Sequence, residues 1–381
     1  MREGDVGNLV LAAFRLRALR SPRGLAFFLR NLLRIRRAEA THRRMQEGEP
    51  GIIPTILAIS PTMRCNLDCA GCYSRSRSED EELSTEEFRS LLDDAERLGV
   101  SAVVLTGGEP LLRSDAVSMI EEHGRLFFVL ISNGGPLTGE TARRLAGSGN
   151  CLVLISLDGD RDTHDARRGG GSHERAMTAM SLLWEHRCPF GFASVNTRLN
   201  WRWFAGSGFL DEMIGRGCVL GLFTEYVPVG PAPRPDWIMG ADDRDAFRAW
   251  VLRRRARSGL TMVQFPQDEY GSANRCTGAG VRSLHINAQG GIEPCPFVNV
   301  SVETIRDGGL QAACRSPYLA SLRADPGILS RDRLACSLFE HLDAVVEHAA
   351  RRASEEPSAD GHRSSSTRVS ATAEPPESRS T

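Results

Sequence analysis

Apolar runs recur along the middle of the chain, with polar stretches of helical periodicity between them. Six runs have the length and composition of buried strands, at 56–60, 102–106, 126–132, 151–157, 190–196 and 219–226. The clearest helix between them is 84–98, where Ser84 and Glu87 form a capping box. Strands that alternate with helices favour a parallel sheet with right-handed crossovers. The pattern therefore predicts an α/β fold, either a partial barrel or an open sheet, with its active site at the carboxyl ends of the strands.

The segments that flank this repeat have other patterns. Residues 1–50 are basic and amphipathic, so we expect helices that pack on the main domain or make peripheral contact with an anionic membrane surface. Proline and glycine at 227–235 indicate a linker, whereas the tail has almost no apolar residues and is predicted to be disordered. The expected divisions are a helical segment at 1–50, a core domain at 54–230, a linker and helix at 231–267, a cysteine-bearing domain at 268–349 and a tail at 353–381.

Composition narrows the classes of function. All 47 basic residues are arginines, which excludes Schiff-base chemistry and a P-loop lysine. The formal net charge of −1 gives no global field that would attract nucleic acid. Neither an uninterrupted apolar run long enough to cross a membrane nor a secretory signal is evident, so we expect a cytoplasmic protein.

Three of the ten cysteines lie within eight residues, directly after the first strand run. Cys65, Cys69 and Cys72 have the spacing C-x3-C-x2-C. Three thiolates on one tight loop can hold three corners of a metal cluster and leave the fourth corner open for chemistry. A zinc site remains an alternative for this triplet taken alone.

With Tyr73 beside the last cysteine, the loop resembles the cluster motif of radical S-adenosylmethionine (radical SAM) enzymes, and the resemblance extends over 54–230 in order. It continues with Thr106-Gly107-Gly108-Glu109-Pro110, with Ser132-Asn133-Gly134-Gly135, and with Ser156-Leu157-Asp158-Gly159 followed by His164 to Gly169. The resemblance implies a partial (βα)6 TIM-like barrel with a small C-terminal auxiliary-cluster domain. The expected cofactor-binding residues are Tyr73, Gly107, Gly108, Glu109, Pro110, Ser132, Asn133, Ser156, Arg168 and Asn196.

The resemblance also implies roles for these residues. The Gly107–Pro110 segment would bind the amino group of the cofactor's methionine moiety, Ser156 its ribose and Arg168 its carboxylate. Asp158 is either a substrate or cofactor contact or the cap of the following turn. Glu225, at the end of the sixth strand run, is either a proton acceptor facing the barrel mouth or a salt-bridged carboxylate.

The chemistry implied by the resemblance needs two cofactors. Cys65, Cys69 and Cys72 would hold a [4Fe-4S] cluster whose open iron binds S-adenosyl-L-methionine. Reduction of the cluster, by a donor such as flavodoxin or ferredoxin, would yield a 5′-deoxyadenosyl radical that abstracts hydrogen from a substrate.

A second set of cysteines lies near the C-terminus. Cys276, Gly290 and Cys295 follow a C-x13-G-x4-C pattern, and Cys336 comes later. Two strands joined by a glycine turn would bring Cys276 and Cys295 together. The set resembles the opening of the SPASM or twitch auxiliary-cluster extension and implies one auxiliary iron–sulfur cluster, with zinc as the alternative. Cys314 is either a further ligand or a residue of a helix core.

Three functions from different classes remain open. The first is a radical SAM enzyme that oxidises or matures a peptide or protein. The second is a radical SAM enzyme of cofactor, lipid or small-metabolite biosynthesis. The third is a non-enzymatic metal-binding scaffold, which the ordered glycine, glutamate and arginine motifs disfavour.

Overall fold

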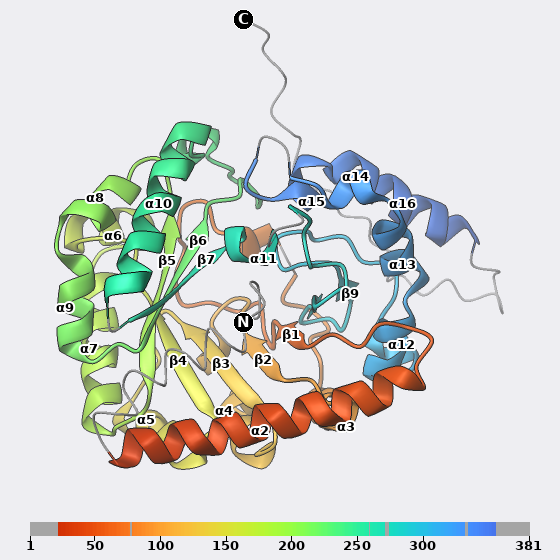
Figure 1. Ribbon diagram of the computed structural model, residues 1–381, viewed down its shortest axis with the longest axis horizontal. Helices are drawn as coiled ribbons and strands as arrows, with labels where there is room; N and C mark the ends of the chain where they lie inside the picture. Colours follow the sequence, from red (N-terminus) through yellow and green to blue (C-terminus); the bar gives the residue numbers. More distant parts are fainter. Residues whose placement is uncertain (1–21, 77, 259, 271–273, 332–333, 356–381) are drawn as a thin grey trace, which may run out of the picture.

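A single curled sheet carries the chain's chemistry-bearing loops. The computed structural model describes residues 22–76, 78–258, 260–270, 274–331 and 334–355. The sheet has nine strands in the order β7-β6-β5-β4-β3-β2-β1-β8-β9, and every neighbouring pair is parallel except β8 and β9 (Figure 1). The strands are β1 (Ile56–Ile59), β2 (Ala102–Leu105), β3 (Phe127–Ser132), β4 (Cys151–Ser156), β5 (Phe190–Asn196), β6 (Leu220–Glu225), β7 (Thr261–Phe265), β8 (Ser283–Ile286) and β9 (Ile292–Glu293).

Helices cover the convex side of this sheet (Figure 1). Those of the repeat are α3 (Thr85–Leu98), α4 (Ala116–Glu122), α5 (Gly139–Ser148), α6 (Arg161–Arg168), α7 (Ser172–Glu185), α8 (Trp201–Gly206), α9 (Phe209–Arg216) and α10 (Ala241–Arg257). The others are α2 (Pro22–Glu47), α11 (Gln267–Tyr270), α12 (Gly309–Arg315), α13 (Pro317–Ala324), α14 (Pro326–Leu329), α15 (Ser337–Glu340) and α16 (Leu342–Glu355). The predicted α/β partial barrel is confirmed, and all six predicted strand runs form β1 to β6. The capping box also forms, since Ser84 Oγ accepts from the Glu87 amide and Glu87 accepts from the Ser84 amide.

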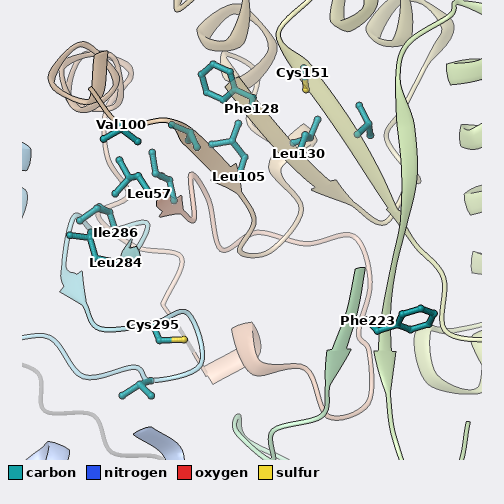
Figure 2. Packing of buried hydrophobic residues seen from close by; sticks show 14 of the residues in the cluster. Leu57, Val100, Leu105, Phe128, Leu130, Cys151, Phe223, Leu284, Ile286 and Cys295 are labelled. Carbon is teal, nitrogen blue, oxygen red and sulfur yellow. The ribbon is translucent and has the colours of Figure 1, made fainter. Parts of the chain in front are cut away.

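The larger core lies between the sheet and these helices. Phe128 and Leu130 of β3 and Phe223 of β6 project into it (Figure 2). Leu57 of β1 and Ile286 of β8 extend the same core toward the C-terminal part of the chain. Because β8 pairs with β1 in parallel, the region expected as a separate domain at 268–349 shares one sheet with the repeat.

Helix α2 closes the opposite end of the barrel from the strand carboxyl ends. Asn31 Nδ2 donates to the carbonyl of Gly149 at 3.2 Å, and Arg34 Nε donates to the carbonyl of Gly124 at 2.7 Å. Those carbonyls immediately precede β4 and β3, so α2 crosses the amino ends of the strands. Phe28 and Ile35 of α2 pack against side chains on the inner face of the sheet. Among the described residues no helix is long and apolar enough to cross a membrane.

The proline-rich stretch after β6 is packed against the loop that follows β1. A Cβ at Gly230 would lie 2.5 Å from the carbonyl oxygen of Cys72, and one at Gly71 would lie 2.9 Å from the hydroxyl of Tyr226. Trp237 stacks edge-on against Tyr226 and also covers Gly71. Expected as a linker, this stretch instead braces the cysteine loop. At the other end of the chain, α16 continues to Glu355, and the rest of the predicted disordered tail lies outside the described residues.

Candidate active site

The segment Cys65–Tyr73, called the cluster loop below, follows β1 at the carboxyl edge of the sheet. Its three cysteines are free thiols: Cys65 is exposed, Cys72 half-buried and Cys69 buried. Partial desolvation of its sulfur raises the pKa of Cys65, and the charges of Glu109, Cys69 and Cys72 add to this rise. Burial likewise raises the pKa of Cys69, against the opposing charges of Arg168 and Arg167. The three thiols therefore share one site with two arginines beside it, and a cationic cluster would stabilise all three as thiolates.

The Gly107–Pro110 segment lies directly against the start of the cluster loop. A Cβ at Gly108 would meet the carbonyl oxygen of Arg64 at 2.3 Å, and Gly107 has φ +103° beside Ser60 and Thr62. The amide of Glu109 donates to the Arg64 carbonyl at 2.8 Å. Both glycines are therefore needed for the two loops to approach, whatever ligand they also admit.

Glu109 is a buried carboxyl with three donors from the protein. Oε1 accepts from the Leu111 amide at 3.1 Å and Ser132 Oγ at 2.9 Å, and Oε2 accepts from the Asn133 amide at 2.7 Å. Burial raises its pKa to about 7, although these bonds favour the ionised form. A carboxylate has room for about four hydrogen bonds, so one position stays available for a cofactor ammonium group.

The loop after β3 is tied to the cluster loop as well. Asn133 Nδ2 donates to Asn66 Oδ1 at 2.8 Å and approaches Cys65 Sγ at 3.8 Å. The hydroxyl of Tyr73 lies 3.0 Å from Thr106 Oγ1 at the end of β2. Ser132, Asn133 and Tyr73 therefore lie around the cysteines.

Two arginines converge on one carboxylate beyond β4. Asp158 Oδ2 accepts from Arg167 Nη1 at 2.6 Å and from Arg168 Nε at 2.5 Å, and Oδ1 accepts from the Val195 amide at 2.8 Å. Burial opposes ionisation of Asp158, but the charges of Arg168 and Arg167 outweigh it and hold its pKa well below the ordinary value. Asp158 is thus a positioning residue for both arginines, whereas the turn that follows is capped by Asp160, whose side chain accepts from Thr163.

Two other predicted site residues lie on the far side of the sheet. Asn196 pairs in register with Glu225, on the same face as Phe192 and Phe223, which pack against the outer helices. Glu225 Oε1 accepts from Arg244 Nε of α10 at 2.7 Å. The structure does not bring these two side chains to the barrel mouth, because the alternation of side chains along β5 and β6 directs them outward.

The interior of the barrel is lined mainly by apolar side chains that keep some solvent access. Every side chain of β4 is buried, but on β2, β3, β5, β6 and β7 some of the inward-facing side chains are only half-buried. These interior residues are Val104, Val129, Ile131, Val195, Leu222, Thr224 and Phe265. Ser156 also faces inward, at the end of β4. The half-buried part of the barrel interior is therefore mainly apolar.

Three of the four later cysteines form a second group, around the hairpin of β8 and β9. Burial raises the pKa of Cys276 to about 12, and the charge of Cys336 adds to it. Burial also raises the pKa of Cys295, with Cys336 and Cys276 contributing. Cys314 is not in this group. It lies on α12 within the core, where burial and the charges of Glu49 and Asp94 raise its pKa to about 12.

The two cysteine groups are joined by aromatic rings. Tyr73 of the cluster loop lies with its ring centroid 5.0 Å from that of Phe297, which follows Cys295 by two residues. Phe297 in turn lies 5.7 Å from Phe265 at the end of β7. In the described parts of the chain, no three His, Cys, Asp or Glu side chains meet in the tight arrangement that one metal ion requires.

Some residues of the site carry no recognisable sequence signal. Arg167 stands next to the expected Arg168, and only the fold shows that both contact Asp158. Phe297 and Tyr226 reach the cluster loop from distant parts of the sequence. Glu269 lies close enough to Cys276 and Cys295 for its charge to influence both thiols. Its position seven residues before Cys276 is a weak sequence signal for this proximity.

Comparison with known proteins agrees with this arrangement. A sequence model of the radical SAM superfamily matches residues 59–199. Mycofactocin maturase MftC of Mycolicibacterium smegmatis is 37% identical over 334 residues, which cover 79% of this chain and 80% of that protein. The AdoMet-dependent heme synthase of Methanosarcina barkeri is 31% identical over 67% of this chain and 80% of its own length. The crystal structure of Streptococcus suis SuiB bound to precursor peptide SuiA superposes with a TM-score of 0.61 at 18% identity, covering 76% of this chain and 70% of SuiB.

The chain belongs to the radical SAM superfamily. It is therefore a radical SAM enzyme, and its family implies a [4Fe-4S] cluster and S-adenosyl-L-methionine as cofactors.

Proposed function

We propose that this enzyme matures a peptide, with the cluster loop and its neighbours as the cofactor site. In this proposal Cys65, Cys69 and Cys72 hold the [4Fe-4S] cluster. Their shared site, with Arg167 and Arg168 beside it, supports this role. When bound, the cluster and S-adenosyl-L-methionine supply abstraction of a hydrogen atom from an unactivated C–H bond.

The surrounding residues bind and orient the cofactor. Glu109 accepts the cofactor's ammonium group at its remaining lone pair, and Ser132 and Asn133 fix that carboxyl by donating to it. Arg168 offers a guanidinium that suits a carboxylate, and Asp158 holds it in place. Ser156 faces the interior at the end of β4, where it contacts the ribose in this proposal.

We also assign an auxiliary iron–sulfur cluster to Cys276, Cys295 and Cys336. The mutual influence of these thiols supports the assignment, as does their connection to Tyr73 through Phe297. Glu269 is a carboxylate near Cys276 and Cys295 that can serve as a non-cysteine fourth ligand, because Cys314 lies elsewhere in the fold.

One observation carries the peptide assignment: the chain is 37% identical to a maturase, over most of the length of both proteins. A solved structure with the same fold also holds a precursor peptide. The half-buried apolar lining of the barrel interior suits an apolar side chain of such a peptide. The relative that synthesises heme favours a second candidate, an oxidation of a porphyrin side chain.

Anaerobic reconstitution followed by reduction with S-adenosyl-L-methionine tests the central claim. We expect 5′-deoxyadenosine from the wild-type enzyme and none from Cys69→Ala, whereas Cys151→Ala, which changes a buried thiol of β4, retains the activity. Short peptides encoded beside the gene and an iron porphyrin are then compared as substrates. A peptide that loses mass in step with 5′-deoxyadenosine formation supports maturation; the same behaviour from the porphyrin alone overturns it.

A further inference from the structure

Helix α2 has one face that the barrel uses and one face that it leaves open. Phe28, Asn31 and Ile35 are buried against the amino ends of the strands. On the opposite side Leu25, Leu29 and Leu33 are 40%, 47% and 54% exposed. Residues four apart on a helix lie on one side of it, so these three leucines form a continuous apolar stripe.

This stripe stands out from the rest of the surface. The described residues include seven exposed large hydrophobic side chains, and three of them are on α2. The remaining four, Trp184, Leu199, Leu252 and Val281, come from separate parts of the chain. Single exposed leucines need no explanation, but a row of them along one helix marks an interaction surface.

Helix α2 as a whole is strongly basic. The helix contains seven arginines and two glutamates, although the whole chain has a formal net charge of −1. Arg36 and Arg43 continue the line of the three leucines, and both are exposed. Within the described part of the chain, neither of them forms an ion pair with a carboxylate. We call Leu25, Leu29, Leu33, Arg36 and Arg43 the outer stripe of α2.

We propose that the outer stripe of α2 docks the enzyme on an anionic phospholipid surface. Leucines that enter the headgroup boundary beside arginines that bind phosphate are the pattern of an interfacial helix. The sequence before α2 continues this composition, with Leu9-Val10-Leu11 followed by Arg15 and Arg17. Pairing of two copies through the stripe is disfavoured, because it would bring arginines of like charge together.

The position of α2 gives this docking a direction. The helix lies along one edge of the molecule, at the amino ends of the strands (Figure 1). The cluster loop lies at the carboxyl ends, where the barrel opens. A molecule seated on a membrane through α2 would therefore present its active site away from the lipid.

Vesicle flotation of the full-length protein tests this proposal. We expect binding to phosphatidylglycerol–phosphatidylcholine vesicles at ~0.1 M salt and loss of binding at ~1 M salt or on pure phosphatidylcholine. The double variant Leu29→Asp/Leu33→Asp should lower the bound fraction by about tenfold. Arg36→Glu/Arg43→Glu should lower it similarly, through the charge alone.

Leu199→Asp is the matched control, because this leucine is 63% exposed and lies outside α2. It should bind vesicles like the wild type. Thermal unfolding checks that all variants fold, and formation of 5′-deoxyadenosine, which does not depend on lipid, should be equal in each. The proposal is overturned if wild-type protein ignores anionic vesicles, or if the α2 variants bind as well as Leu199→Asp. It is also overturned if the α2 leucine variant instead abolishes a dimer seen by sedimentation.

Discussion

Tyr73, the residue after the third cysteine of the cluster loop, packs on Phe297, the second residue after Cys295. Their ring centroids are 5.0 Å apart and their planes are inclined by 59°. This contact joins segments more than 200 positions apart in the sequence. It places the two proposed cluster sites on either side of one aromatic pair.

Truncation of Phe297 should separate the two sites functionally. Phe297→Ala removes the ring that touches both Tyr73 and Phe265, and we expect a loss of about 1–3 kcal/mol in unfolding free energy because Phe297 is half-buried. The amount of product per 5′-deoxyadenosine should fall, since cofactor cleavage needs only the cluster loop. Trp184→Ala, which changes an exposed aromatic on α7, should leave this ratio unchanged. An unchanged ratio in Phe297→Ala would refute the coupling role.

The cysteine groups predict the iron content of the reconstituted protein. With two [4Fe-4S] clusters the wild type should hold about eight irons, and Cys276→Ala about four. Cys314→Ala should keep the wild-type number, because its thiol lies with Glu49 and Asp94 and not with the other three. Iron analysis and electron paramagnetic resonance of the reduced protein measure this. A loss of iron in Cys314→Ala would contradict the assignment.

Removal of the Asp158 charge should destabilise the folded protein. Asp158→Asn leaves Arg167 and Arg168, whose side chains are only 12% and 11% exposed, without a counter-charge, and breaking such a pair costs about 3–5 kcal/mol. We also expect weaker binding of S-adenosyl-L-methionine, because Arg168 loses the group that orients it. Chemical denaturation and equilibrium binding give the two values.

The exposed pair Arg234–Asp236 provides the matched comparison for Asp158. Its nitrogen and oxygen are 2.9 Å apart, and about half of each side chain is exposed. Asp236→Asn should therefore leave stability nearly unchanged. If both variants were equally mild, the Asp158 carboxylate would not hold the arginines as described.

Glu109 should make cofactor binding depend on pH. Burial raises its pKa to about 7, so below that pH the free enzyme carries a neutral carboxyl that cannot hold an ammonium group. Affinity for S-adenosyl-L-methionine should rise from about pH 6 to about pH 8 and then level off. The stability of the cofactor-free protein should change with pH in the opposite direction. Because the pKa of Glu109 is higher in the folded than in the unfolded protein, protonation of Glu109 stabilises the fold. This contribution is complete below the unfolded-state pKa of about 4.3 and is lost as the pH rises through about 7.

Glu109→Gln, which cannot ionise, should bind the cofactor weakly at every pH and lose both pH dependences. Isothermal titration calorimetry and thermal melts across this pH range measure the two effects. A binding profile in Glu109→Gln that matches the wild type would exclude Glu109 as the titrating group.

The sequence predicted the repeat and its loops because each depends on local pattern. The six strand runs, the Ser84 capping box and the motifs around Cys65, Glu109 and Arg168 all follow from neighbouring residues. Contacts between distant segments could not be predicted in this way. The packing of Gly230 on Cys72 and the pairing of β8 with β1 depend on how the chain returns to its own start.

The placement of Asn196 and Glu225 shows a second limit. Both are polar residues at strand ends, and polarity alone pointed them to the barrel mouth. Successive side chains of a strand point to opposite faces of the sheet, so a shift of one residue along the strand reverses the face on which a side chain lies. Arg244 of α10 neutralises Glu225 on the outer side, and that arginine is 19 positions away.

The pairing of β8 with β1 has a consequence for how the protein is made. Ile56–Ile59 leaves the ribosome more than 200 residues before its second neighbour, Ser283–Ile286, has been synthesised. During that interval the strand leading into the cluster loop remains an open edge, to which a strand of another nascent chain can add. Chains that end before residue 283 keep this edge permanently. The C-terminal region therefore also acts as the final closure that protects the first strand from aggregation.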